Sequence, residues 1–333
     1  MATAPAGSEP SLVPLAEIER AAARLVPILP PTPVVTFQGT DPLVHGRVLA
    51  KLETANLTHS FKIRGALNTM LTMQGTLPPH GVVTSSAGNH GLAVSKAAQL
   101  LDVPATVVLP AGATRTKVAG IEALGARTIF VEGDYGLAEA KARELAQQQN
   151  MFFLSPYDEP LVMAGAGTIG LELARQVPHL ARVVVPVGGA GLISGLGSAL
   201  AHVRPSVEVV AVQTDASPVL HTIFHGGDGT KAVLKRSMAD GLTGHVDPSS
   251  RTVPILRRVA RRFLLVPEER IAPAVARVAQ QERLLIEGAT ATAPAALYEG
   301  MLGPPPPGDT VLLLSGANID LERWWACVQA WTP

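Results

Sequence analysis

The sequence lacks the features that mark secreted, membrane-spanning and nucleic-acid-binding proteins. Its 333 residues include one cysteine, Cys327, which cannot form a disulfide within the chain, so nothing indicates an oxidising compartment. No apolar run is long enough to cross a membrane, and the opening "MATAPAGSEPS" has no basic stretch before an apolar core, so no signal peptide is expected. The 27 acidic and 27 basic residues leave no basic excess for a nucleic acid. We therefore predict a cytoplasmic protein without nucleic-acid or membrane partners.

Apolar β-branched runs alternate with alanine-rich helical stretches along most of the chain. The predicted strands are "RVLAKLE" from residue 47, "GVVTSS" from 81, "ATVVLP" from 105, "RTIFVEG" from 127, "MFFLSP" from 151, "RVVVPVGG" from 182, "VEVVAVQ" from 207, "RFLLVP" from 262 and "DTVLLLSG" from 309. Several are apolar throughout, as is typical of parallel strands covered on both faces. Strand and helix alternating in this way predict a doubly wound α/β architecture. The first dozen residues are expected to be a loose tail, and 215–255 an irregular excursion near a site or an interface.

The stretch "SFKIRGA" (60–66) places a lysine, Lys62, on the predicted first turn of a helix, after Ser60 as a candidate N-cap. The positive end of the helix dipole disfavours an ammonium there, and burial beside Phe61 and Ile63 acts in the same direction. Both effects lower the pKa of the amine and favour Schiff-base chemistry with an aldehyde. The alternative is a lysine that reaches to water from an amphipathic helix, and this stretch alone favours that alternative.

Two loops that follow predicted strands are suited to anions. "SSAGNHG" (85–91) opens a helix and offers free N–H groups, the Ser86 hydroxyl and the Asn89 amide, which suit a carboxylate or phenolate oxygen, although a plain capped helix would use the same residues. "PVGGAGLISG" (186–195) is a glycine-rich turn before another helix, which suits a phosphate. A dinucleotide fingerprint with Glu208 as its acidic partner competes there, but the glycine spacing misses that motif by one residue.

The last predicted strand ends at Ser315 in "LLLSGANID" (312–320). A hydroxyl at this place can bond a ring nitrogen without forcing it to be protonated, although alone it could be only a helix cap. Together, an amine for a carbonyl, a glycine cradle for a phosphate, a hydroxyl for a pyridine nitrogen and an asparagine beside an anion pocket match the needs of pyridoxal 5′-phosphate. The set, in this order, resembles the fold-type II pyridoxal-phosphate enzymes and, within them, the serine/threonine dehydratase family.

The resemblance covers residues 20 to 320 and implies two intimately linked open twisted sheets with flanking helices, as in the tryptophan synthase β fold. It implies a large cofactor-binding domain over 1–78 and 155–333, a small domain over 79–154 that carries the asparagine loop, and a homodimer. Lys62 would hold the cofactor through a carbon–nitrogen double bond. The cofactor-binding residues implied are Lys62, Phe61, Asn89, Gly188, Gly189, Ala190, Gly191, Leu192 and Ser315. The substrate-binding residues implied are Ser86, Ala87, Gly88, Asn89, His90 and, in "MADGL", Asp240.

Departures from the family pattern narrow the expected activity. Ala87 stands where related serine racemases have an acid/base serine, so racemisation is disfavoured. Gln213 stands where the family's divalent-cation site has a glutamate, so no Mg²⁺ or Ca²⁺ site is expected. Ala190 replaces a cradle glycine, which we expect to be tolerated only at negative φ. His59 replaces the glycine of "TGSFK" and either touches the substrate or covers the lysine, and Thr290 falls where a glycine is expected.

The function implied is α,β-elimination from a β-hydroxy amino acid such as L-threonine or L-serine, which gives a 2-oxo acid and ammonia. Lys62 would act as general base, and a hydroxyl at Ser315 would leave the ring nitrogen neutral and favour prompt loss of the β-leaving group. The alternatives are β-replacement or another lyase reaction on a different β-substituted amino acid, a non-catalytic ligand-binding relative, and an NAD-dependent oxidoreductase that rests on "GGAGLISG" alone. With no further domain after Pro333, feedback control is not expected.

Overall fold

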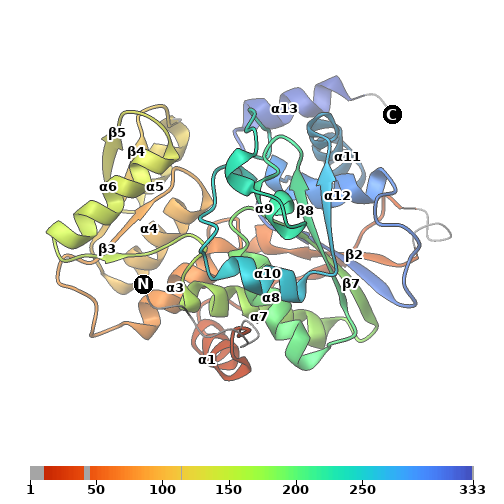
Figure 1. Cartoon of the computed structure of the whole chain (residues 1–333), viewed down its shortest axis with the longest axis horizontal. Coiled ribbons are helices and arrows are strands. Elements are labelled where there is room, and N and C mark those ends of the chain that lie inside the picture. Colours follow the sequence, from red (N-terminus) through yellow and green to blue (C-terminus); the bar gives the residue numbers. More distant parts are fainter. Residues whose placement is uncertain (1–10, 41–45, 114, 332–333) are drawn as a thin grey trace.

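Two β-sheets organise the part of the chain that the computed structural model describes, residues 11–40, 46–113 and 115–331 (Figure 1). One sheet has six strands and the other has four, and helices flank both. The predicted α/β class with two sheets is confirmed, and each of the nine predicted strands is present. The predicted loose tail lies almost entirely outside the described residues.

The larger sheet has the strand order β1-β2-β10-β7-β8-β9, with β1 antiparallel and the other strands parallel. Its strands are β1 (Val34–Thr36), β2 (Val48–Leu52), β7 (Leu180–Pro186), β8 (Glu208–Thr214), β9 (Arg262–Val266) and β10 (Asp309–Leu314). The sequence pattern did not predict β1, because three residues at a sheet edge are too few to show a period.

Alternate residues of the central strands of the larger sheet face two separate cores. Val183 and Val185 pack into one cluster with α1 (Leu15–Leu25), α7 (Pro160–Gln176), α8 (Gly191–Val203) and α10 (Thr252–Val259), whereas Val184 packs into another with α11 (Ile271–Glu282) and α12 (Gly288–Tyr298). Because successive side chains of a strand point to opposite faces, a strand covered by helices on both faces is apolar throughout. This explains the continuous run "RVVVPV" and confirms a doubly wound sheet.

The smaller sheet is fully parallel and has the order β5-β4-β3-β6. Its strands are β3 (Val82–Ser85), β4 (Ala105–Pro110), β5 (Arg127–Val131) and β6 (Phe152–Phe153). Helices α3 (Lys62–Thr72) and α4 (Asn89–Leu101) cover one face through the cluster around Val107, and α6 (Tyr135–Gln148) covers the other through Val108. Figure 1 shows this unit in orange and yellow beside the larger sheet.

The helices connect these strands, and several begin directly after a strand. The α-helices are α1 (Leu15–Leu25), α3 (Lys62–Thr72), α4 (Asn89–Leu101), α5 (Arg115–Ala123), α6 (Tyr135–Gln148), α7 (Pro160–Gln176), α8 (Gly191–Val203), α9 (Val219–Phe224), α10 (Thr252–Val259), α11 (Ile271–Glu282), α12 (Gly288–Tyr298) and α13 (Leu321–Ala330). Short 3-10 turns are η1 (Glu53–Ala55), η2 (Gly229–Lys231), η3 (Asp240–Leu242) and η4 (Glu268–Arg270). None of the helices within these described ranges is long and apolar enough to span a membrane.

Helix α3, which begins with Lys62, packs against α7 at very close range. A Cβ atom at Gly65 would lie 2.8 Å from Val162, and one at Gly165 would lie 2.5 Å from the Arg64 carbonyl oxygen. Only glycine allows the two backbones to approach this closely. The contact fixes the lysine-bearing helix between the two sheets.

Candidate active site

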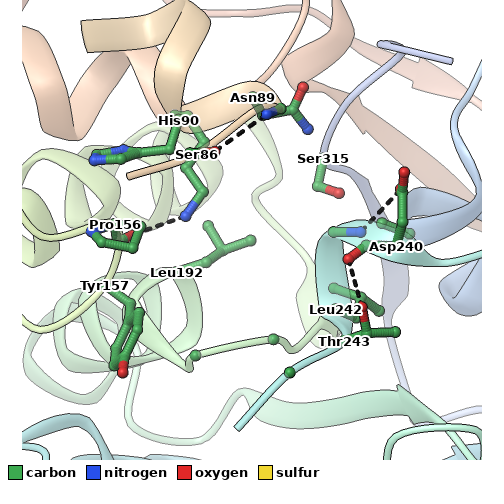
Figure 2. Close-up of a pocket in the computed structure, with 18 of the residues that line it drawn as sticks. Ser86, Asn89, His90, Pro156, Tyr157, Leu192, Asp240, Leu242, Thr243 and Ser315 are labelled. Carbon is green, nitrogen blue, oxygen red and sulfur yellow. Dashed lines mark hydrogen bonds between the residues drawn. The ribbon is translucent and has the colours of Figure 1, made fainter. Parts of the chain in front are cut away.

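One cavity of about 300 Å³ lies at the carboxyl ends of the strands of both sheets, and all of the site residues expected from the sequence line it. Figure 2 labels six of them: Ser86, Asn89, His90, Leu192, Asp240 and Ser315. Ligand sites in open α/β sheets lie at this end, because the loops that follow parallel strands gather there. The excursion 215–255 also contributes, through the segment Asp240–Val246. This part of the excursion therefore lies beside the candidate site.

Lys62 is the first residue of α3, and its amine lies inside the cavity. Its Nζ donates to the Pro156 carbonyl oxygen at 2.7 Å and lies 5.1 Å from the centre of the Phe61 ring. Burial lowers the pKa of Lys62 to about 8, against the opposing effect of the Glu287 carboxylate. Near pH 8 a large share of this amine is therefore neutral and nucleophilic.

The expected N-cap role of Ser60 is wrong. The cap residue is Phe61, without a side-chain cap, and the buried Ser60 hydroxyl has no hydrogen-bond partner among the described residues. The segment is held instead by pairing with the chain after β10: Ser60 forms an antiparallel bridge with Gly316, and the Phe61 N–H donates to the Ser315 carbonyl at 3.0 Å. This pairing brings the lysine beside Ser315.

The loop "SSAGNHG" presents hydrogen-bond donors to the cavity. Ser86 Oγ accepts the Gly88 N–H at 3.2 Å, which leaves its own proton free for a carboxylate. Asn89 begins α4, whose first-turn N–H groups have no partner within the helix. The His90 ring is buried, and its Nε2 lies 3.1 Å from the Leu154 carbonyl oxygen. Burial lowers the pKa of His90 to about 3. A neutral ring must donate to that carbonyl, so the backbone N–H is the group that His90 offers to an anion.

The glycine-rich loop between β7 and α8 lines the opposite side of the cavity, next to Leu192 and Tyr157 (Figure 2). A Cβ at Gly188 would lie 2.9 Å from the Gly241 carbonyl oxygen, and one at Gly191 would lie 2.8 Å from the Tyr157 Cα. These neighbours leave no room for side chains, so the backbone N–H groups before α8 are exposed to the cavity as an anion cradle.

Ala190 contradicts the expectation of a negative φ. It has φ +63° and ψ 4°, in the left-handed region, and serves as the cap residue of α8. The site requires this conformation to turn the cradle into the helix, and alanine adopts it at a cost of about 1–2 kcal/mol because its Cβ crowds the carbonyl oxygen.

Replacing Ala190 with glycine is therefore expected to raise the free energy of unfolding of the cofactor-free protein by about 1 kcal/mol, because glycine adopts positive φ without strain. Urea unfolding of both proteins measures the change. Ala201→Gly, at an exposed position of the same helix, is the matched control and should lower the free energy by about 1 kcal/mol. Equal destabilisation by both substitutions would contradict the strain argument.

Glu287 is a buried carboxyl in the cavity to which the sequence reasoning assigned no role. The Asn89 amide donates to its Oε1 at 2.7 Å, and the Asn318 amide donates to Asn89 Oδ1 at 2.6 Å. Burial and the nearby Asp240 charge raise the pKa of Glu287 to about 7. These two hydrogen bonds fix the orientation of the Asn89 side chain. They also place beside it the Glu287 carboxyl, which titrates near neutral pH.

Glu287 makes the stability of the cofactor-free protein depend on pH. The pKa of Glu287 in the folded protein lies above its ordinary value of 4.5. The contribution of this group to the free energy of unfolding is therefore fully present below pH 4.5 and is lost as the pH rises through 7. The loss amounts to about 3 kcal/mol. Urea unfolding at pH 5 and pH 7.5 should show this loss in the wild type and not in Glu287→Gln. The same fall in both proteins would show that another group causes it.

Other residues that the sequence reasoning did not single out complete the wall. Lys117 donates to Asp240 Oδ2 at 2.9 Å and so links α5 to η3 across the cavity. Burial raises the pKa of Tyr157 to about 12, which keeps its phenol protonated. No local motif marks these positions. His59 has φ +53° and an exposed side chain that lies 3.4 Å from the Thr54 carbonyl, and it does not line the cavity, which leaves the substrate-contact alternative without support.

Glu208 and Gln213, two residues considered in the sequence analysis, both lie outside the cavity. Glu208, the candidate ribose partner of a dinucleotide, starts β8 and binds Arg182 and Arg262 at 2.6 and 2.7 Å, away from the cavity. Gln213 Oε1 accepts the His221 N–H at 3.2 Å. Within the described ranges, no group of three or more His, Cys, Asp or Glu side chains is arranged to hold a metal ion.

Comparisons with known proteins agree on one family. Residues 26–316 match the family described as pyridoxal-phosphate dependent enzyme. The L-threonine ammonia-lyase of Geobacter sulfurreducens is 38% identical over 272 residues, which are 82% of this chain and 67% of that protein. The crystal structure of a threonine deaminase from T.th. is 33% identical, covers 92% of this chain and 99% of its own, and superposes with a TM-score of 0.82. A maize serine racemase is 26% identical over 95% of this chain and 96% of its own, with a TM-score of 0.85.

Proposed function

The chain belongs to the family of pyridoxal-phosphate dependent enzymes, and on that premise we propose that it catalyses the deaminating dehydration of a β-hydroxy amino acid such as L-threonine or L-serine. The products would be a 2-oxo acid and ammonia. The observation that carries the proposal is one cavity lined by the buried Lys62 amine, the asparagine loop, the glycine cradle and Ser315.

These residues fit pyridoxal phosphate. Lys62 offers a buried amine of lowered pKa to an aldehyde, and the Cβ-free backbone before α8 fits a phosphate. Ser315 offers a hydroxyl to the ring nitrogen, Asn89 would lie near the 3′-oxygen, and Phe61 would lie beside the ring. When bound, the cofactor would supply an electron-withdrawing ring that acidifies the α-hydrogen of an attached amino acid.

Side chains and backbone groups of the protein would bind the substrate and transfer the proton. Ser86 and the first-turn N–H groups of α4 would hold the substrate carboxylate and so fix the α-hydrogen relative to Lys62. The Lys62 amine, which lies in the cavity with a lowered pKa, would take the α-proton as general base. The β-hydroxyl would leave together with one proton as water, and addition of water to the resulting unsaturated amine would give the 2-oxo acid and ammonia.

Ala87 supports elimination over racemisation. The residue lines the cavity next to Ser86, and its methyl group can neither donate nor accept a proton. Racemisation needs a second acid/base group on the other side of the substrate carbon from Lys62. We therefore propose that the activity follows the threonine deaminase rather than the serine racemase.

The direct test is incubation of the enzyme, loaded with pyridoxal phosphate, with L-threonine or L-serine, followed by assays for ammonia and 2-oxo acid. Both products should form in equal amounts, with little D-serine from L-serine. A parallel reaction with O-acetylserine and sulfide detects β-replacement as cysteine. Cysteine without deamination, or an inert protein that binds the cofactor, would overturn the proposal in favour of the corresponding alternative.

A homodimer, a cytoplasmic location and a separate small domain over 79–154 are further parts of the proposal. Support comes from the family resemblance, from the lone cysteine, and from the four strands of the smaller sheet, which all lie within that range. Sedimentation at the mass of a single chain would exclude the dimer.

A further inference from the structure

Thr290 places an unexpected hydroxyl directly behind Ser315. It lies on the first turn of α12, is fully buried and is not part of the cavity wall, whereas Ser315 is. Thr290 Oγ1 lies 3.0 Å from Ser315 Oγ, 2.7 Å from the Gly316 carbonyl oxygen and 2.8 Å from the Gly316 nitrogen. Thr290 thus has three polar partners and a single proton.

Counting protons fixes the direction of these bonds. The Gly316 carbonyl can only accept, so a 2.7 Å contact between the two oxygens requires the Thr290 proton between them. The Gly316 N–H donates into one lone pair of Thr290. The second lone pair faces Ser315, so the 3.0 Å contact is a hydrogen bond only when Ser315 donates its own proton. The Ser315 proton then points away from the cavity, and its lone pairs point toward it.

We propose that Thr290 is a positioning residue that makes Ser315 a hydrogen-bond acceptor, so that the site favours the protonated form of the cofactor ring nitrogen. The inference rests on the proposed function, because Ser315 faces that nitrogen only in a site that binds pyridoxal phosphate. The lone pair of an unprotonated nitrogen would face a lone pair of the Ser315 oxygen, so no hydrogen bond would form. A protonated nitrogen would instead donate a hydrogen bond to that oxygen. This replaces the simpler expectation, from the serine alone, of a neutral ring.

The consequence concerns the reaction at the substrate α-carbon. A protonated ring withdraws electrons more strongly than a neutral one, and therefore stabilises the negative charge left when Lys62 takes the proton. Without the Thr290 hydroxyl, Ser315 is free to turn its proton into the cavity and donate to an unprotonated nitrogen. The hydroxyl of a residue that does not touch the cofactor would thus set the electronic state of the cofactor.

The test is ¹⁵N NMR of holoenzyme prepared with pyridoxal phosphate labelled at the ring nitrogen, because protonated and unprotonated pyridine nitrogens have well-separated chemical shifts. Thr290→Val removes the hydroxyl at nearly constant shape, and Thr290→Gly removes the whole side chain in case valine impairs folding. Thr290→Ser keeps the hydroxyl. Thr292→Val is the matched control, because Thr292 is equally buried on the same helix but donates to the Ala289 carbonyl at 2.8 Å, away from Ser315.

We expect the ¹⁵N chemical shift of a protonated ring nitrogen in the wild type, Thr290→Ser and Thr292→Val. In Thr290→Val and Thr290→Gly we expect the chemical shift of an unprotonated ring nitrogen. An unprotonated ring in the wild type overturns the inference, as does a protonated ring in the folded valine or glycine variant. Both results leave the proposed function intact, since the visible imine absorbance of the same samples reports it separately. If the wild type forms no imine with the cofactor, the proposed function fails and this inference fails with it.

Discussion

Replacing Lys62 with alanine is expected to abolish both the visible imine absorbance of the enzyme loaded with pyridoxal phosphate and its turnover of L-threonine. The substitution removes the buried amine whose lowered pKa, about 8, suits it to an aldehyde. It also removes the proposed general base, and loss of the base alone lowers rates by roughly 10²–10⁴-fold. Spectra and ammonia release, measured on the same samples, check the two effects together.

A second lysine in the cavity provides the matched control. Lys117 also lines the wall, but its Nζ is engaged in an ion pair with Asp240 Oδ2 at 2.9 Å. Lys117→Met should therefore keep the imine absorbance. If Lys62→Ala retained full deaminase activity with added cofactor, or if only the Lys117 variant became colourless, the assignment of the lysine would be wrong.

The fold was predictable from the sequence where local pattern and burial agree. Runs such as "ATVVLP" coincide with β4, because a strand covered on both faces needs apolar residues at every position. The site motifs also follow from the sequence, since each loop is local and each lies after a strand. That they line one cavity depends on parallel strands, whose carboxyl ends share one edge of a sheet.

The errors concern features that distant contacts decide. Ser60 has the residue type of an N-cap, but the local backbone pairs with Gly316, a residue far along the chain. Ala190 takes a left-handed φ because the turn into α8 demands it, and alanine carries no signal of that demand. Glu287 reaches Asn89 across 198 positions of sequence, and its raised pKa results from burial that no single stretch reveals.

Replacing Arg64 with methionine is expected to destabilise the protein by about 3–5 kcal/mol, because it breaks a buried ionic network beneath the lysine. The Arg64 Nε and Nη2 donate to Glu53 at 2.7 and 2.9 Å, and the same guanidinium binds Glu172. Lys51 also binds Glu172, so two cations balance two carboxylates. Arg64 and Glu53 are almost fully buried, so methionine would leave the Glu53 carboxylate buried without its ionic partner.

The network also connects stability to the site, since Arg64 lies two residues after Lys62 on α3. Urea unfolding of the cofactor-free protein measures the loss, and Arg20→Met is the matched control, because the Arg20 ion pair with Glu17 is exposed and should contribute little to stability. Adding Glu53→Gln to Arg64→Met removes the buried Glu53 carboxylate that has lost its ionic partner. The double variant should therefore recover part of the lost stability. If the single Arg64 variant lost no more than the Arg20 variant, the buried charges would not hold the lysine-bearing helix in place. If the double variant were no more stable than the single one, the cost would come from packing rather than from the unpaired charge of Glu53.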